Sequence, residues 1–111
     1  MTARPEYLER MQGDDNTAEN AALWLVLEIT CGSNKNDAEI EQVAIALLRH
    51  AETERDYDTG YFAYLSALLA ALIGNRKLFM TAARAHAKRG PRSGESAAIM
   101  ILRQMLDRQE P

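Results

Sequence analysis

The sequence predicts an all-α protein, a compact bundle of five to six helices around one nearly all-apolar helix at about 59–74. Alanine occurs 18 times and leucine 13 times in 111 residues, against eight valines and isoleucines together. Alanine and leucine favour helices, whereas β-branched residues favour strands. The length suits a single domain over 1–111, and an apolar content of 47% suffices for a modest core.

Residues 1–15 are expected to form a short helix or arm. Pro5 suits a first helical turn, and Gly13 follows the expected end near Met11. The acidic turn after Gly13 then leads toward a longer helix.

The second helix is expected to begin at Asn16, which forms a capping-box pattern with Glu19. It runs to about Cys31, with Gly32 as its stop. The apolar centre at 23–29 also resembles a buried strand, but the cap, the length and three alanines favour a helix.

The third helix repeats the capping pattern with Asn36 and Glu39, and it ends in the acidic run 52–56. Its apolar residues follow the helical spacing i, i+3, i+4, i+7, which predicts one face toward the core. These residues are Ile40, Val43, Ala44, Leu47, Leu48 and Ala51.

The fourth helix is expected between a cap at Asp58 or Thr59 and a stop at Gly74-Asn75. Within 61–73, Ser66 is the only residue outside the apolar and aromatic set. A helix that is apolar all round must be covered all round, and a small domain has little surface to spare for that. We therefore expect this helix to meet a second chain as well.

A fifth helix is predicted from about 76 to 89, ended by Gly90-Pro91, and Ser93 is expected to cap a sixth. The apolar residues of the sixth helix that are expected to share its inner face are Ala98, Ile101, Leu102, Met105 and Leu106. The tail at 109–111 is expected to fray.

The hairpin of the fourth and fifth helices faintly resembles a tetratricopeptide unit. Gly74 lies at its turn, Ala82 and Ala83 lie in its second helix, and Pro91 follows. The match covers about 30 residues, and such arrays need about three repeats for stability. The first helix also lacks the large residues of that family, so we do not assign the chain to it.

Charge divides the chain into two unlike halves. Residues 1–75 carry five basic and 13 acidic side chains, and residues 76–111 carry eight basic and three acidic ones. Such an asymmetry is typical of contact with an acidic partner or nucleic acid, or of attraction between halves or subunits.

Cysteine usage and hydropathy predict a cytoplasmic protein outside the membrane. Cys31 is the only cysteine, so no disulfide forms within the chain, and no apolar signal segment follows Met1. The stretch at 61–73 is shorter than the roughly 20 residues of a membrane span.

No pattern indicates catalysis, a cofactor, a metal site or a small-molecule ligand. His50 and His86 have no His or Cys three or four residues away, so the spacing typical of zinc sites is missing. Both are expected to be packed or half-exposed side chains. Cys31 follows a helix end, where its thiolate is not favoured. We therefore expect no enzymatic activity.

A ridge of aromatic and leucine side chains is the predicted partner-binding site. Tyrosine and tryptophan are over-represented among the residues that dominate interface energies. The ridge comprises Tyr57, Tyr61, Tyr64, Leu65, Leu68 and Leu72, and Trp24 and Leu27 join it from the second helix. The alternative for the tyrosines is that their rings lie in the core and their hydroxyls reach water.

A basic segment at 76–92 is the second candidate site. Lys77, Arg84 and Lys88 form a stripe along one face of the fifth helix, and Arg89 and Arg92 follow it. Such a stripe suits an acidic protein or phosphates. The net charge of −3 and the absence of Asn, Gln or Ser on this helix argue against reading bases.

The sequence thus predicts a non-enzymatic protein–protein interaction module, a homodimer that acts as a small cytoplasmic regulator or inhibitor. It would cover an apolar surface of a partner protein, for example as an anti-activator of a transcription factor. The alternatives are a nucleic-acid-binding regulator that uses 76–92, or a structural subunit of a larger complex.

Overall fold

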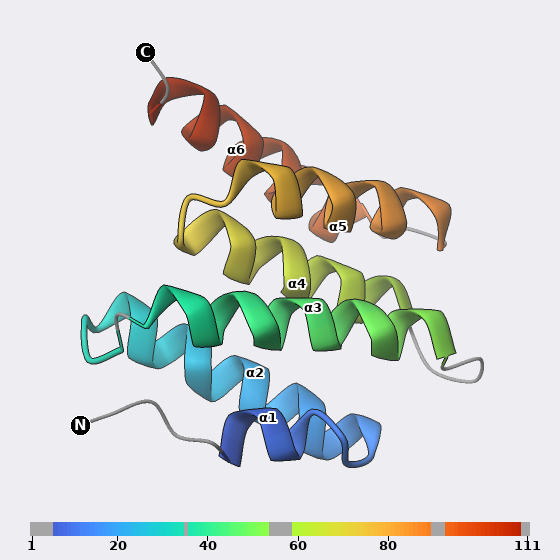
Figure 1. The fold of residues 1–111 in the computed structure, drawn as a ribbon. Helices are drawn as coiled ribbons and strands as arrows, with labels where there is room; N and C mark the ends of the chain where they lie inside the picture. The colour runs from blue at the N-terminus through green and yellow to red at the C-terminus, as the bar shows by residue number, and fades with distance from the viewer. Residues whose placement is uncertain (1–5, 35, 54–58, 90–92, 110–111) are drawn as a thin grey trace.

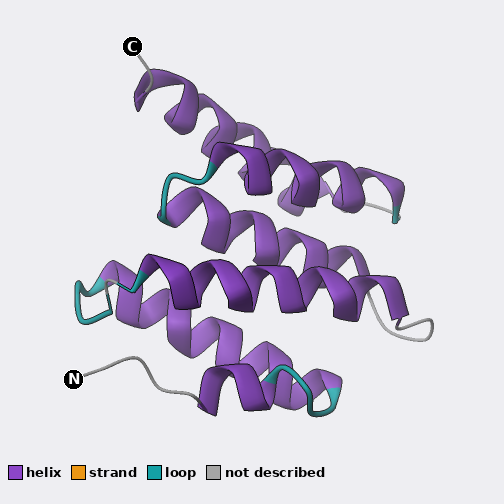
Figure 2. Ribbon diagram, in the orientation of Figure 1, coloured by secondary structure: helices purple, strands orange, loops and turns teal. Residues whose placement is uncertain are grey.

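The computed structural model describes residues 6–34, 36–53, 59–89 and 93–109, and these residues form six helices and no strand (Figure 2). The all-α prediction is confirmed. The helices are α1 (Glu6–Arg10), α2 (Asp15–Thr30), α3 (Asp37–Thr53), α4 (Thr59–Leu72), α5 (Arg76–Lys88) and α6 (Ser93–Gln109). The expected caps at Asp58 and the stop at Gly90-Pro91 lie outside the described residues.

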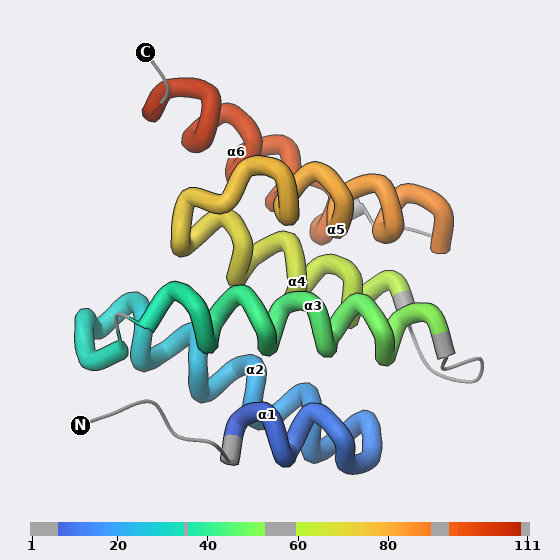
Figure 3. Tube along the Cα trace, in the orientation of Figure 1, coloured from blue at the N-terminus to red at the C-terminus, as the bar shows by residue number. Residues whose placement is uncertain are grey.

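The helices follow one another back and forth, so that neighbours in the chain are antiparallel (Figure 3). The α1 and α2 helices lie on one side of the α3–α4 pair, and α5 and α6 lie on the other (Figure 1). The radius of gyration, 13.1 Å, agrees with the ~13 Å of a compact domain of this length. The stack therefore has two open ends, formed by α2 with α1 and by α6.

The α4 helix belongs to two core clusters, which explains why it lacks a polar face. Phe62, Leu65 and Leu69 lie in a cluster with residues of α1, α2 and α3. Ala67 and Ala70 lie in a second cluster with residues of α5 and α6. From the sequence, part of α4 was expected to be covered by a second chain. In the structure, α3 and α5 pack along two sides of α4 and cover most of it.

The predicted inner face of α3 is confirmed. Five of its six residues are fully buried, and the sixth, Leu48, is half-buried and packs against both clusters. The spacing of the apolar residues predicted the inner face correctly because α3 also has a clear polar side, where Gln42, Arg49 and Glu52 are exposed.

The predicted start of α2 is wrong by two residues. Asp14, in extended conformation, is the N-cap, and its Oδ1 accepts a hydrogen bond of 2.8 Å from the backbone N–H of Thr17. Asn16 already lies in the first turn, so the capping box expected with Glu19 does not form. Both Asp and Asn are good N-caps, and the sequence pattern selected the wrong one.

The predicted glycine stops are confirmed. Gly32 and Gly74 both have positive φ, 79° and 72°, which glycine adopts without steric cost. After Gly74, Asn75 caps α5 by accepting from the Leu78 N–H at 3.0 Å, and its amide donates to Glu41 of α3 at 2.8 Å. The α4–α5 turn is therefore fixed to α3.

The start of α3 contains a buried carboxylate with an unpaired oxygen. Asn36 caps the helix, because its Oδ1 accepts from the Glu39 N–H at 3.2 Å. The Glu39 side chain does not return to the cap, and its buried Oε1 has no hydrogen-bond partner. Burial raises the pKa of Glu39, the Asn34 amide lowers it, and the charge of Glu28 raises it further.

We expect Glu39→Gln to make the protein more stable at neutral pH. Glutamine removes the charge of Glu39, which is the form that burial disfavours, whereas a charge in a first helical turn contributes only about 0.3–1 kcal/mol of favourable interaction with the helix dipole. Because the pKa of Glu39 is raised in the folded state, its contribution to folding stability is fully present at pH values below the pKa of the unfolded chain. This contribution is lost as the pH rises through the pKa of the folded state. Urea unfolding should therefore separate variant from parent at pH 7 and bring them together near pH 4.

The control is Asp37→Asn, which changes an exposed carboxylate in the same first turn. It should lower stability by a few tenths of a kcal/mol, because it removes a favourable interaction with the helix dipole. A Glu39→Gln protein less stable than the parent at pH 7 would show that the Glu39 charge is satisfied in the folded state.

Candidate protein-binding surface

The α2 helix leaves three large apolar side chains in solvent. Leu23, Trp24 and Leu27 are 39%, 60% and 53% exposed, and they share the outer face of the helix. We call these three residues the α2 strip. Trp24 and Leu27 are two of the residues that the sequence predicted for partner binding, and the structure brings them together with Leu23.

The inner face of α2 holds smaller side chains than the outer face. Its fully buried residues are Ala18, Ala21, Ala22 and Leu25. Burial of apolar area stabilises a fold by about 25 cal/mol per Å², so folding alone favours Trp24 inside and alanines outside. The reversed arrangement leaves the largest apolar side chain of the helix available to another molecule.

The part of the predicted ridge on α4 is much less open than expected. Leu65 is 1% exposed and packs in the core, so we leave it out of the candidate surface. Tyr61, Tyr64, Leu68 and Leu72 are half-buried. Tyr57 lies outside the described residues.

The rings of Tyr61 and Tyr64 pack against the core, which agrees with the first part of the alternative that the sequence left open. Their ring centroids are 6.2 Å apart, and the Tyr64 ring lies 6.5 Å from that of His86. Burial, and then the nearby Glu19 carboxylate, raise the pKa of Tyr61 to about 12. The Tyr61 hydroxyl therefore stays protonated at neutral pH.

Three residues of the predicted basic stripe are exposed along α5. Lys77, Arg84 and Lys88 lie in solvent and form no ion pair with a described residue. Arg89 instead donates to the carbonyl of Ala51, which belongs to the last turn of α3. Arg92 lies outside the described residues. The stripe that remains for a partner is thus shorter than the segment 76–92.

The two histidines are packed, as expected. His86 is 2% exposed, and its Nε2 lies 3.0 Å from Oε1 of Glu95 on α6. The ring of His50 stacks on Phe62 with a centroid separation of 5.4 Å, and its Nδ1 lies 3.4 Å from Asp15. These contacts join α5 to α6 and α3 to α4 and α2, so they account for both side chains structurally.

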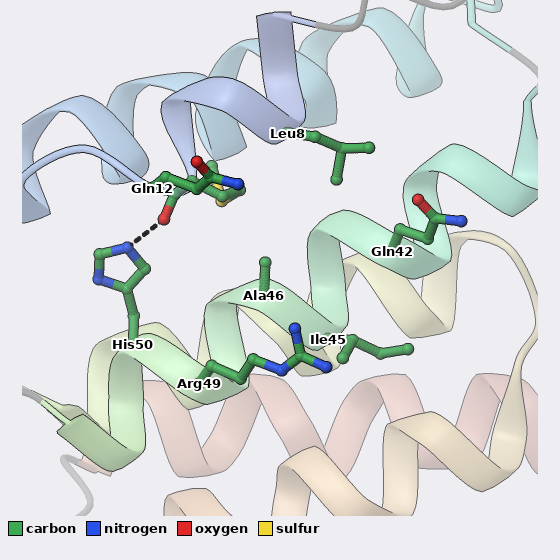
Figure 4. A pocket seen from close by; sticks show the side chains of 8 residues that line it. Leu8, Gln12, Gln42, Ile45, Ala46, Arg49 and His50 are labelled. Carbon is green, nitrogen blue, oxygen red and sulfur yellow. Dashed lines mark hydrogen bonds between the residues drawn. The ribbon is translucent and has the colours of Figure 1, made fainter.

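A groove of about 630 Å³ lies between α1 and α3 (Figure 4). Leu8 and Ala46 point into it, Ile45 lies at its border, and His50 donates to the Met11 carbonyl at one end. Its volume is within the range of small-ligand pockets. The sequence carried no signal for it, because the groove depends on how two helices distant in the chain lie side by side.

The outer face of α6 is a second apolar surface that sequence reasoning missed. Met100, Ile101 and Met105 are 65%, 59% and 48% exposed, and we call them the α6 strip. The predicted inner face is therefore wrong for Ile101 and Met105. The side chains that pack inward are Ile99, Leu102 and Leu106.

The physical reason for this error is that residues 97–102 are all apolar, so two different faces satisfy a helical spacing. The packed face is the one that meets Phe79 and Ala82 of α5 and the small residues of α4.

Within the described ranges, no three His, Cys, Asp or Glu side chains are grouped so that they could hold a metal ion. None of the helices in these ranges combines the length and the apolar character needed to cross a membrane. No family model, no curated protein and no solved structure matches the chain.

Proposed function

We propose that the protein is a non-enzymatic protein–protein interaction module whose contact residues are centred on the α2 strip. The observation that carries this proposal is the 60% exposure of Trp24 on a helix that buries alanines. Tryptophan is the residue type most enriched among interface hot spots, and exposed apolar clusters mark binding surfaces. Leu23 and Leu27 flank it on the same face.

The mode of recognition that fits this surface is packing of an apolar helix or groove of another protein onto α2. A small cytoplasmic regulator or inhibitor, for example an anti-activator that covers the apolar surface of a transcription factor, would act in this way. The exposed free thiol of Cys31 at the end of the strip is compatible with a reducing compartment. Self-association through the same surface belongs to this proposal.

Trp24→Ala is expected to weaken partner binding while leaving the fold intact. A hot-spot aromatic contributes about 2 kcal/mol or more to binding, whereas an exposed substitution changes folding stability by about 0.5 kcal/mol or less. Thermal unfolding checks the second statement. Cross-linking in the cells of origin checks the first, with a photoreactive residue in place of Asn20, which is exposed on α2 one turn before Trp24.

The matched control carries the photoreactive residue in place of Ala87, which is exposed on α5. Position 20 should label a discrete protein of another mass that position 87 does not label, and Trp24→Ala should remove that product. Equal labelling from both positions, or labelling that survives Trp24→Ala, would contradict the proposal.

The second candidate function is nucleic-acid binding, and the exposed stripe of Lys77, Arg84 and Lys88 favours it. Arg84→Glu together with Lys88→Glu should leave folding nearly unchanged, because exposed charges contribute roughly 0–1 kcal/mol. We expect the parent to bind random duplex DNA or RNA no better than this variant in a filter-binding assay at physiological salt. Clear binding by the parent that the variant lacks would favour the nucleic-acid function instead.

A further inference from the structure

The two apolar strips lie at opposite ends of the helix stack. The α2 helix, which carries the exposed α2 strip, lies on one side of the α3–α4 pair, and α6 lies on the other side (Figure 1). Each end therefore presents one helix whose inner face is packed and whose outer face is apolar. Met100 and Met105 make the α6 strip adaptable, because methionine is flexible and fits irregular surfaces.

The charges around the two strips are opposite. Residues 11–34, which include all of α2, hold four acidic side chains and no basic one. On α6, Arg103 and Arg108 are exposed and pair with no described residue. Acidic side chains at both ends make contacts within the fold: Glu95 with His86 and Asp107 with Arg76 at α6, and Asp14 with the Thr17 N–H, Asp15 with His50 and Glu28 with the Asn34 amide at α2. The two ends therefore differ in net charge, because residues 76–109 hold eight basic and two acidic side chains.

The surrounding helices increase this difference. The exposed Lys77, Arg84 and Lys88 of α5 lie on the same side of the stack as α6. A contact between two α2 strips would bring acidic surfaces together, and a contact between two α6 strips would bring basic surfaces together. Like charges across an interface disfavour association, and opposite charges favour it.

We infer that the α6 strip of one copy of this chain docks on the α2 strip of the next copy. Apolar side chains supply the contact, and the opposite charges around the strips set its direction. This inference rests on the α2 strip being a protein-binding surface, as proposed above, and adds a second surface and a specific occupant. It differs from the homodimer that the sequence predicted, because its contact joins two different surfaces.

A contact between two different surfaces leaves one α2 strip and one α6 strip free at the ends of every pair. Such heterologous contacts give rings where the rotation closes, and open chains where it does not. A different protein bound to the α2 strip would end the chain of copies, so partner binding and self-association compete for Trp24.

The test uses one variant at each strip, Trp24→Ser and Ile101→Ser, in analytical ultracentrifugation of the full chain. The parent should exceed the mass of a dimer as its concentration rises, and added salt should weaken the association. Each variant alone should associate about thirtyfold more weakly than the parent, as expected for loss of a central apolar side chain. Thermal unfolding of both variants should match that of the parent.

The decisive sample is the equimolar mixture of the two variants. Trp24→Ser keeps an intact α6 strip and Ile101→Ser keeps an intact α2 strip, so the mixture should form a species with one chain of each and nothing larger. An isologous α2 pair gives a different result, because Ile101→Ser alone would then form dimers and the mixture would add nothing. That result, or a parent that stays monomeric up to about millimolar concentration, overturns the inference.

The cross-linking experiment separates this inference from the proposed function. Ile101→Ser should not reduce the labelling of the other protein from position 20, because it leaves the α2 strip intact and weakens the self-association that competes for it. If that labelling is present and the parent is nevertheless monomeric, the head-to-tail contact is wrong and the partner-binding function stands.

Discussion

Phe79→Ala is expected to lower the free energy of unfolding by about 3–5 kcal/mol, the range for truncating a fully buried phenylalanine. Phe79 is the only aromatic member of the cluster that joins α4, α5 and α6 in the described residues, and none of its surface is exposed. Its buried neighbours Ala67, Ala70 and Ala82 are too short to extend into the space that the ring leaves. Long side chains of the same cluster, such as Leu106 and Met80, can fill part of that space, and how far they do so sets the cost within that range.

The measurement is urea unfolding followed by circular dichroism, with Thr81→Ala as the control on the same helix. Thr81 is exposed, and its hydroxyl donates only to the Lys77 carbonyl within α5. Its replacement should change stability by about 0.5 kcal/mol or less. A Phe79→Ala cost below about 1 kcal/mol would mean that the α5–α6 end of the stack does not pack around this ring.

The sequence was most informative where local chemistry decides the structure. Gly32 and Gly74 end helices because they adopt positive φ, and Asn36 starts one because its side chain accepts a backbone N–H. These effects act within a few residues, so they can be recognised without tertiary structure. The prediction of the start of α2 was wrong at the same local level, because Asp14 and Asn16 are both possible N-caps and their capping preferences differ little.

Sequence reasoning was less successful where tertiary packing decides which apolar residues are covered. The α4 helix and the outer face of α2 look equally apolar in the sequence, yet Leu65 is buried and Trp24 is exposed. The difference arises because α4 packs closely along both α3 and α5, whereas the contacts of α2 with α1, α3 and α4 leave its face with Leu23, Trp24 and Leu27 exposed. Position in the stack is not encoded in the periodicity of any single helix.

The candidate site changed for this reason. Trp24 and Leu27 were predicted from their residue type, and their exposure supports keeping them. The α6 strip was missed because Ile101 was assigned to the packed face. The α6 helix is apolar on most sides, so the spacing of its residues does not say which side packs against the rest of the bundle. The packed side is determined by the small residues of α4 and α5 that it meets.

Ser66→Leu is the second substitution for which we expect a large loss of stability. Ser66 is fully buried on α4, and its Oγ donates to the Ala44 carbonyl of α3 at 2.7 Å. Ala63 and Ala44 are also fully buried, so α3 and α4 approach closely here through small side chains. Leucine would force these helices apart at a cost on the order of 1–3 kcal/mol, and loss of the hydrogen bond would add about 1 kcal/mol.

The matched control is Ser66→Ala, which removes the hydroxyl without adding volume and should therefore cost only the hydrogen bond. Comparing the two variants by thermal unfolding isolates the packing cost at the α3–α4 contact, because both lack the bond to Ala44. If Ser66→Leu were no less stable than Ser66→Ala, a leucine would fit between the helices and their close approach would not be a requirement of the fold. The expected gap of about 1–3 kcal/mol would instead show that this position requires a small side chain, and the cost of Ser66→Ala alone would show what the serine hydroxyl adds through its bond to Ala44.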